Sequence, residues 1–448
     1  MKETTTFGYH RYEFDEYGIK VEVTRFRPER GDLHAYFNIT ADPIQYPGME
    51  YPHVMLQKQN LSSGNAKSTL VNNLQDRISL GKEIWAGVVE TVCTRSLRTH
   101  WKGSDVVKIG KNPRRTEVPY LLYPVIRKDA PCIIYGTGGI GKSYVSLYFA
   151  LLVQHNLSVG RLAPRQANVL YLDWESGEED LNDRLVALNK GLGIEGELNY
   201  RRCYDDLKDD VDELAKWISQ DNIDLVIVDA KGAAIGGQIN EAKETIQMFN
   251  ALRSLNVTSV IVDHVSKEAN SGPIGSVYNL NEARNVWEMR ASQEEGSDTS
   301  RIGLYHRKTN VGKRHKAFGL EFKFLDDGYD NIDTVWVSEV DVGEDSETRA
   351  GLTMQDQIEA ILRDSIEQHM DGSYEYTAMS IEEIRQHVKA RGNTPNTNTV
   401  STRLSDKKYN NIRWRHEGVG KYIYIPEHSR PDAYNGTGVI REEVKPTW

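Results

Sequence analysis

Eight consecutive residues, GTGGIGKS at 136–143, have the types and spacing of a phosphate-binding loop. The apolar run 130–136 precedes the loop and the helical pattern 143–154 follows it, as such a loop requires. Glycines let backbone N–H groups approach a phosphate, and the start of a helix favours negative charge. Lys142 would place its charge between the β- and γ-phosphates, and the Ser143 hydroxyl would bind Mg²⁺. We therefore expect ATP and Mg²⁺ as ligands, held by Gly136, Thr137, Gly138, Gly139, Ile140, Gly141, Lys142, Ser143 and Tyr144.

Acidic residues at the ends of two apolar runs are candidates for the rest of a hydrolytic site. Asp229 lies at the end of 223–230, where a carboxylate can hold Mg²⁺ through water. In isolation, an aspartate at that point could equally cap a helix. Glu175 ends the run 168–175 and could orient an attacking water molecule. Asp173 points the same way along that strand and is the competing candidate.

The elements that would position these residues alternate between strands and helices from about 119 to 327. Near-continuous runs of valine, isoleucine and leucine are typical of parallel strands covered by helices on both faces. The last two strands, 301–310 and 316–324, are expected to form a terminal hairpin on that sheet. The fold class is therefore α/β. The expected strands are 130–136, 168–175, 223–230 and 257–264, and the expected helices are 143–154, 178–192, 211–220 and 241–255.

The first hundred residues have a different pattern and predict a separate α+β domain at 1–100. We expect strands at 18–27, 33–42 and 54–60, then helices at 66–80 and 82–97. Polar residues at 101–118 predict a linker, and the acidic, irregular stretch 328–352 predicts a second one.

A last domain is expected at 353–426, followed by a flexible tail at 427–448. Three helices, at 354–370, 380–391 and 394–408, precede two short strands within 411–426. This order is that of a winged helix. Ser380 and Glu383 have the spacing of a helix capping box.

The winged helix concentrates positive charge on an otherwise acidic chain. Residues 385–421 carry a net charge of +7, whereas the whole chain of 448 residues carries −10. Such a concentration predicts contact with DNA phosphates. The alternative is a protein-docking domain with a solvated basic face. The candidate contacts are Arg403, Lys407, Lys408, Arg413 and Arg415.

The composition disfavours several other classes of protein. The three cysteines, Cys93, Cys132 and Cys203, are far apart, which disfavours a disulfide framework and a zinc site. The longest apolar run, 147–153, is far shorter than a membrane helix. The polar, acidic start of the chain lacks the features of a signal peptide. We expect a cytoplasmic protein with no membrane contact.

Together these motifs resemble the hexameric RecA-like ATPases of replicative-helicase type, the superfamily 4 branch. The subgroup that the sequence resembles most is the plasmid and phage "AAA family ATPases" with the helicase core of plasmid RepA proteins. The resemblance covers about 119–327 and implies a RecA-like P-loop core. It rests on YGTGGIGKS, VLYLDWES, LVIVDA and VIVDHVSKE, and on the later segments GSVYNLNEARNVWEMR and LYHRKTN.

The resemblance implies roles around the nucleotide. The catalytic glutamate of RecA-like ATPases lies on the strand that Glu175 ends. The arrangement in which it directly follows Asp229 does not apply, because Ala230 stands there. His264 matches the histidine that senses the γ-phosphate. Arg284 matches the arginine finger that reaches a neighbouring subunit, although an ordinary surface arginine remains the alternative.

Further positions follow from the same resemblance. Arg307 and Lys308 lie where relatives supply additional cations in trans, and Lys308 is preferred. The loop 266–275 matches the one that grips single-stranded DNA in the ring channel, with Lys267 as the candidate phosphate contact. The loop 231–240 is the second channel candidate.

The leading hypothesis is an ATP-hydrolysing, ring-forming DNA translocase, a helicase of replicative type that acts as a homo-oligomer, a hexamer. Its partners would be single-stranded DNA in the channel and double-stranded DNA at the winged helix. The alternative is an ATP-switched DNA-binding assembly factor or regulator without unwinding activity. A P-loop kinase of small molecules is disfavoured, because no lid or substrate-binding acid pattern is present.

Overall fold

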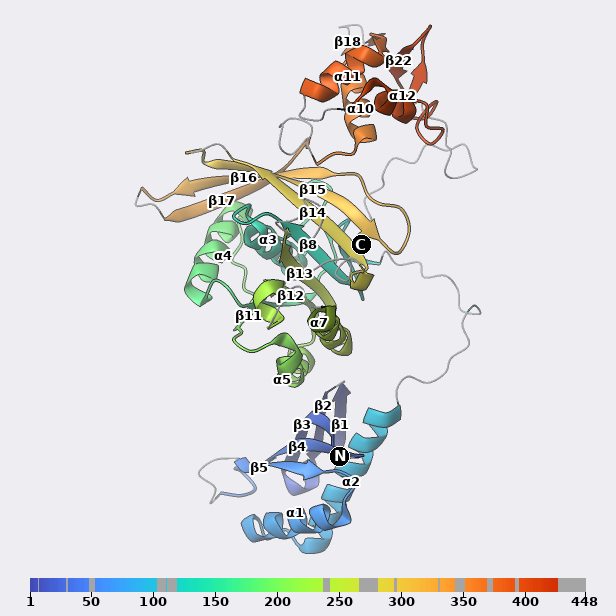
Figure 1. Ribbon diagram of the computed structural model, residues 1–448. Coiled ribbons are helices and arrows are strands. Elements are labelled where there is room, and N and C mark those ends of the chain that lie inside the picture. Colours follow the sequence, from blue (N-terminus) through green and yellow to red (C-terminus); the bar gives the residue numbers. More distant parts are fainter. Residues whose placement is uncertain are drawn as a thin grey trace.

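The computed structural model describes residues 1–6, 8–29, 31–47, 53–102, 110, 119–236, 242–265, 281–293, 296–328, 331–342, 351–368, 374–390 and 395–425. These residues form an N-terminal, a central and a C-terminal region, each with hydrophobic clusters of its own (Figure 1).

The N-terminal region is an antiparallel sheet with the order β1-β2-β3-β4-β5, followed by two helices. One face of the sheet buries apolar residues of its inner strands, such as Val21, Val23 and Phe37, against helix residues that include Trp85. The predicted strands and helices are present. The structure adds β1 and β2, whose polar sequences do not mark them as strands. The elements are β1 (Lys2–Thr6), β2 (Tyr9–Phe14), β3 (Ile19–Glu29), β4 (Asp32–Ala41), β5 (His53–Asn60), α1 (Gly64–Arg77) and α2 (Lys82–Lys102).

The central region is built on a nine-stranded sheet with the order β11-β10-β12-β13-β8-β14-β15-β16-β17. The strands from β11 to β14 in that order are parallel, and β15 to β17 continue as an antiparallel meander. The strands are β8 (Pro131–Gly136), β10 (Asn168–Asp173), β11 (Asn199–Arg202), β12 (Ile223–Asp229), β13 (Thr258–His264), β14 (Asn285–Ser292), β15 (Thr299–Thr309), β16 (Phe318–Asp326) and β17 (Ile332–Val340).

Helices cover both faces of the central sheet, as the sequence predicts. Two of them, α3 and α4, belong to the hydrophobic cluster of one face, and α5 and α7 to that of the other. Three short strands, β6, β7 and β9, form a small separate sheet. The remaining elements are β6 (Tyr120–Tyr123), β7 (Ile126–Arg127), β9 (Ala163–Pro164), α3 (Lys142–His155), α4 (Glu178–Leu192), α5 (Leu207–Gln220), α6 (Lys231–Ala234) and α7 (Ala242–Ser254).

The prediction that 328–352 is a linker is wrong for the first part of this range, because β17 lies there and pairs with β16. Its Val335 is fully buried and Val337 packs on the same hydrophobic cluster, whereas alternating residues such as Ser338 face outward. The acidic Asp333 and Glu339 share the face of Val335, and the apolar Trp336 is exposed on the other face, so the sequence of this strand lacks a clean period-two pattern. Residues 343–350, like most of the predicted linker 101–118, lie outside the described residues.

The C-terminal region has three helices and a hairpin in the order expected from sequence, but the first helix is shorter than the predicted 354–370: it ends at Arg363, and a strand at Ile366–Gln368 follows. A small sheet with the order β20-β22-β21 packs against the helices. The capping box is confirmed: Ser380 N donates to Glu383 Oε2 at 2.7 Å, and Glu383 N to Ser380 Oγ at 3.2 Å. The predicted tail lies outside the described residues. The elements are α10 (Met354–Arg363), β18 (Ile366–Gln368), β19 (Tyr374–Tyr376), β20 (Met379–Ser380), α11 (Ile381–Ala390), α12 (Thr397–Leu404), β21 (Trp414–His416) and β22 (Lys421–Tyr424).

Among the described residues, every helix is too short or too polar to cross a bilayer.

The N-terminal sheet contacts helix α5 of the central region through β2 and β3. Tyr9 belongs to the same hydrophobic cluster as Leu214 and Ile218 of α5. Asp212 of α5 lies beneath Gly8, where an added Cβ would come within 2.6 Å of its Oδ1. The contact therefore buries a carboxyl group.

We expect this contact to weaken as the pH rises. Burial raises the pKa of Asp212 to about 6, against the opposing charges of Arg27 and Arg25. Because the pKa in the folded state exceeds the unfolded value, folding favours the protonated form, and stability is lost as the pH rises through 6. The shift corresponds to at most about 3 kcal/mol. Asp212→Asn should therefore raise the unfolding temperature at pH 8, and by a clearly smaller amount at pH 5, because the loss builds up between the unfolded pKa and the folded pKa of about 6.

The exposed Asp224 provides the matched control for this prediction. Asp224→Asn should leave the unfolding temperature unchanged at both pH values. Equal effects of the two substitutions at pH 8 would contradict the assignment to the buried carboxyl.

Candidate active site

The predicted phosphate loop lies between the end of β8 and the start of α3. Gly139 and Gly141 adopt φ angles of +75° and +81°, which only glycine adopts without strain. At Gly136 an added Cβ would come within 2.8 Å of the Met289 carbonyl oxygen, so the neighbouring strand also requires glycine there. The loop ends at the N-terminus of a 14-residue helix, where backbone N–H groups can bind an anion. The backbone therefore has the geometry of a phosphate cradle.

Lys142 lies within this loop and is 6% exposed. Its Nζ donates to the carbonyl oxygens of Gly136 at 3.1 Å and Thr137 at 2.6 Å, and lies 3.3 Å from His264 Nδ1. Burial lowers the pKa of Lys142, whereas the charges of Asp229 and other nearby carboxylates oppose that effect. The amine is thus held at the loop by carbonyl groups that a phosphate could replace.

Ser143 and Asp229 lie next to each other, as a metal-binding pair requires. The Ser143 hydroxyl forms a hydrogen bond to Asp229, and the Tyr171 hydroxyl donates to Asp229 Oδ2 at 2.7 Å. Burial raises the pKa of Asp229, and these two hydrogen bonds act against it. Tyr171 in turn contacts Ser146, its hydroxyl lying 2.9 Å from Ser146 Oγ. Sequence reasoning missed Tyr171, whose only signal is a hydroxyl within an apolar strand.

These oxygen donors fit Mg²⁺. The described residues contain no cluster of three or more histidine, cysteine or acidic side chains that could hold a metal. Magnesium usually binds through one or two protein oxygens and completes its shell with water and phosphate. The pair of Ser143 and Asp229 at the phosphate loop matches that mode.

Glu175 follows β10 and turns its side chain toward His264. The Glu175 side chain is 46% exposed, and its Oε1 lies 3.8 Å from His264 Nε2. His264 also contacts Lys142, so three residues predicted from separate segments lie together. A carboxylate in this position can accept a hydrogen bond from water near the phosphate loop.

Asp173, the competing candidate, has a different place. Its carboxylate is fully buried and accepts the backbone N–H groups of Glu175, Ser176 and Gly177 at 2.7–2.9 Å. Burial disfavours its charge, but these hydrogen bonds outweigh burial and lower the pKa of Asp173. Arg202 adds an ion pair at 3.1 Å. Asp173 shapes the turn that carries Glu175, and its carboxylate oxygens are occupied by the hydrogen bonds of that turn.

Arg284 and Lys308 lie at the opposite end of the strands from the phosphate loop. Arg284 N donates to the carbonyl of Pro131, the first residue of β8, whereas the phosphate loop follows the last. Six strand residues span about 20 Å, so Arg284 cannot reach the loop of its own chain. Lys308 Nζ donates to Ala283 O at 2.8 Å, and burial together with the charge of Arg284 lowers the pKa of Lys308. The two cations are therefore neighbours.

Arg307, the less favoured alternative to Lys308, has its guanidinium engaged within the chain. It pairs with Glu288 and donates to the carbonyl oxygen of Gly351 at 2.7 Å.

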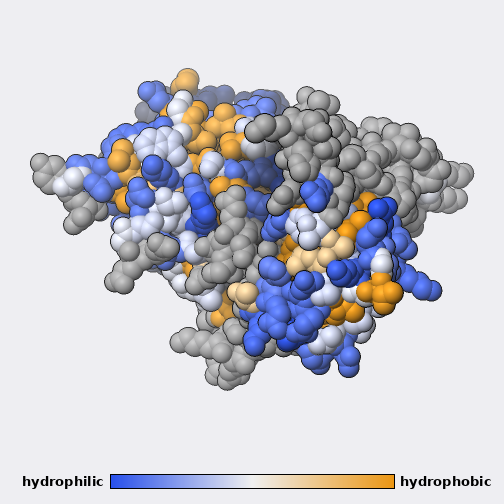
Figure 2. All heavy atoms as spheres, turned by 90° about the horizontal axis from the view of Figure 1, so that it is seen from above, coloured by the Kyte–Doolittle hydropathy of each residue, from blue (hydrophilic) through white to orange (hydrophobic). Residues whose placement is uncertain are grey.

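The predicted DNA contacts separate into exposed and engaged residues. Arg403, Lys407 and Lys408 are exposed on α12 and the turn after it. Arg415 is exposed and lies 3.6 Å from Glu417. Hydrophilic residues cover much of the described surface on the side that carries this region (Figure 2).

Arg413 differs from the other candidates because its side chain is engaged within the chain. Its guanidinium pairs with Asp356 at 2.7 Å and Glu359 at 2.8 Å, and lies over the ring of Tyr409. These contacts join the turn before β21 to α10 and engage the Arg413 guanidinium within the chain.

The two predicted channel loops are only partly described. Lys267 and all of 266–275 lie outside the described residues, as do 237–240 of the second loop. Lys231, at the start of that second loop, is fully buried in α6 and pairs with Asp263 at 3.0 Å.

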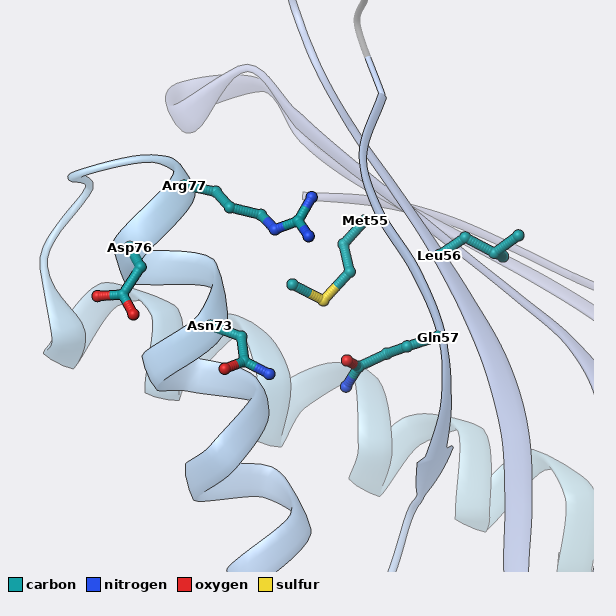
Figure 3. Close-up of a pocket in the computed structure, with 6 residues that line it drawn as sticks. All are labelled: Met55, Leu56, Gln57, Asn73, Asp76 and Arg77. Atoms are coloured by element: carbon teal, nitrogen blue, oxygen red, sulfur yellow. The ribbon is translucent and has the colours of Figure 1, made fainter.

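The N-terminal region has a shallow pocket of about 370 Å³ between β5 and α1 (Figure 3). Asn73 and Arg77 of the helix face Met55 and Gln57 of the strand, whereas Asp76 and Leu56 point away. Arg77 Nη1 is already bonded to the Val54 carbonyl oxygen at 2.6 Å. No nucleotide-site residue lies among the lining residues.

Comparison with known proteins agrees with this geometry at the level of the superfamily. Residues 97–270 match the family described as "AAA domain". This segment contains the phosphate loop, Asp229 and His264, and supports a P-loop ATPase superfamily assignment with ATP hydrolysis as the class of activity.

A search of curated proteins finds no match. Among solved structures, the chain is similar to a KaiC-like protein, PH0186, from the hyperthermophilic archaeon Pyrococcus horikoshii OT3. That similarity has 12% sequence identity and a TM-score of 0.36, and covers 50% of this chain and 98% of the other.

Proposed function

We propose that this chain is an ATP-driven DNA translocase that works as a ring of identical subunits, a hexamer, and unwinds DNA. One observation carries the proposal. The phosphate loop lies with Asp229 and Glu175 where the parallel strands end, and Arg284 lies with Lys308 at the opposite end of those strands. Each copy therefore carries the phosphate-binding part of one catalytic site and the cations of another. In a ring, neighbouring copies would bring the two parts together.

Within one chain, the proposed roles follow from position. The glycine loop and Lys142 bind the β- and γ-phosphates, and Ser143 with Asp229 would hold Mg²⁺. The metal would neutralise developing charge on the phosphate oxygens. Glu175 orients the attacking water and accepts its proton. His264, between Lys142 and Glu175, responds to the γ-phosphate.

Residues from the adjacent copy supply the missing cations. Arg284 would approach the γ-phosphate of its neighbour, where a guanidinium stabilises the charge that develops during phosphoryl transfer. Lys308, held by the Ala283 carbonyl, would add a second positive charge.

The C-terminal region is proposed as a winged helix that contacts duplex DNA. Its helix–helix–hairpin order and its exposed Arg403, Lys407 and Lys408 support this role. Single-stranded DNA would pass through the ring channel, and Lys267 remains the candidate contact there.

Single-stranded DNA provides the direct test. ATP hydrolysis should rise severalfold when it is added, and a forked duplex should be separated only with hydrolysable ATP. ATP turnover that ignores DNA would overturn the translocase. Turnover that responds to DNA without strand separation would instead favour the ATP-switched assembly factor or regulator.

Basic residues on α12 should set duplex affinity. Each phosphate contact removed lowers the salt dependence of log K by about 0.9. Replacing Arg403, Lys407 and Lys408 with alanine should therefore weaken duplex binding and flatten its dependence on salt by up to about 2.7, while ATP binding stays unchanged. Fluorescence anisotropy across a salt series measures both.

Arg363 on α10 supplies the matched control, because it is exposed and pairs only weakly with Asp341 at 3.4 Å. Arg363→Ala should leave duplex affinity unchanged. If it weakened binding as much as the triple variant, the α12 surface would lose its assignment.

A further inference from the structure

Lys231 and Asp263 form a buried ion pair that the proposed mechanism does not use. Lys231 is 0% exposed and Asp263 is 1% exposed, and Nζ lies 3.0 Å from Oδ2. Desolvation makes such a pair a poor source of stability, and apolar residues of similar size often replace one without loss. A buried pair is therefore better explained by what it positions.

Both members lie beside the nucleotide site. Asp263 directly precedes His264, and its Oδ1 accepts the backbone N–H of His264 at 2.8 Å. The strand that carries them pairs His264 with Gly136, the first residue of the phosphate loop, and Val265 N donates to the Gly136 carbonyl. The charge of Asp263 also acts on Lys142.

Lys231 connects this group to the strand that carries Asp229. It lies two residues after Asp229, at the first position of α6. The carbonyl of Asp229 in turn accepts the backbone N–H of Trp174, the residue before Glu175. A continuous series of contacts thus runs from the turn of Glu175, through Asp229 and Lys231, to Asp263 and His264.

We infer that Lys231 and Asp263 are a positioning pair, which holds His264 at the phosphate loop and joins it to the segment after Asp229. Asp263 orients His264 by accepting its N–H, and Lys231 neutralises a carboxylate that would otherwise repel the triphosphate. The chain continues from these two residues into 231–240 and 266–275, the proposed channel loops. This coupling to DNA rests on the proposed function, whereas the positioning of His264 does not.

Two double variants test the inference. Lys231→Met with Asp263→Leu replaces the pair with apolar side chains and removes the acceptor for His264. We expect this first variant to fold and to hydrolyse ATP with an unchanged KM for ATP, but with a kcat lowered about tenfold or more. Lys231→Met with Asp263→Asn keeps an acceptor oxygen, so kcat should recover severalfold relative to the first variant.

The exposed pair of Lys190 and Asp333 serves as a control, because it lies on the same region away from the site. Lys190→Met with Asp333→Asn should leave kcat and KM unchanged. Wild-type kcat in the first double variant would overturn the inference, as would equal losses in both double variants. If neither variant folds, the pair is a stability element and the positioning role is rejected.

Stimulation by single-stranded DNA separates this inference from the proposed function. If the proposed function and this inference are both correct, single-stranded DNA stimulates ATP hydrolysis by the parent protein and does not stimulate hydrolysis by the first double variant. A parent protein that ignores DNA rejects the translocase alone, since the kcat comparison without DNA still decides the role of the pair.

Discussion

Replacing Lys142 with alanine should abolish ATP turnover, with a loss of at least about 100-fold. The amine is held between the carbonyl oxygens of Gly136 and Thr137, at the point where the β- and γ-phosphates would lie. Alanine removes the only charge that the loop itself supplies. ATP affinity should fall too, because the lysine contacts the triphosphate before hydrolysis as well as during it. Steady-state hydrolysis and a fluorescent nucleotide titration measure the two effects.

Lys190 on α4 gives the matched control, since it is a lysine of the same region whose partner, Asp333, lies on the surface. Lys190→Ala should retain full turnover. An Lys142→Ala protein that melts at the parent temperature and still hydrolyses ATP at a comparable rate would rule out this loop as the site.

Replacing Arg284 with alanine should lower turnover about 10³-fold while ATP binding survives. The reason for this separation is distance, because Arg284 lies at the far end of β8 from the phosphate loop of its own chain. A loss of hydrolysis without a loss of binding is the pattern expected when the arginine acts on a neighbour. Hydrolysis and nucleotide titration on the same preparation give both values.

Mixing two inactive variants makes this test sharper. Arg284→Ala subunits keep an intact phosphate loop, and Lys142→Ala subunits keep an intact arginine. Where the two meet in one ring, a complete site forms at their interface, so the mixture should regain activity that neither variant has alone. Absence of recovery, despite mixed particles of ring mass, would reject the shared site.

Arg253 is the control for Arg284, because it lies nearby and is similarly exposed. Its guanidinium forms a surface pair with Glu282. Arg253→Ala should leave hydrolysis unchanged and should not complement Lys142→Ala. Particle mass with and without ATP shows whether either arginine substitution alters assembly.

Much of the fold could be predicted because its signals are local. Apolar runs such as 223–230 identify buried parallel strands, and the glycine loop binds phosphate through consecutive residues. The capping box of α11 is equally local, and the structure contains it as predicted. Strand β17 escaped prediction because the acidic Asp333 and Glu339 share the face of the buried Val335, whereas the apolar Trp336 is exposed, so the sequence shows no clean alternation.

The sequence by itself determined the phosphate loop, the acidic strand end at Asp229 and the alternation of strands and helices, since each is encoded by neighbouring residues. The tertiary structure alone decided which distant side chains meet. It placed Glu175 by His264 while Asp173 shaped the turn, turned Arg413 inward to an acidic pair, and buried Lys231 against Asp263. Such pairings depend on strand order and on the direction of each side chain, which spacing along the chain does not specify.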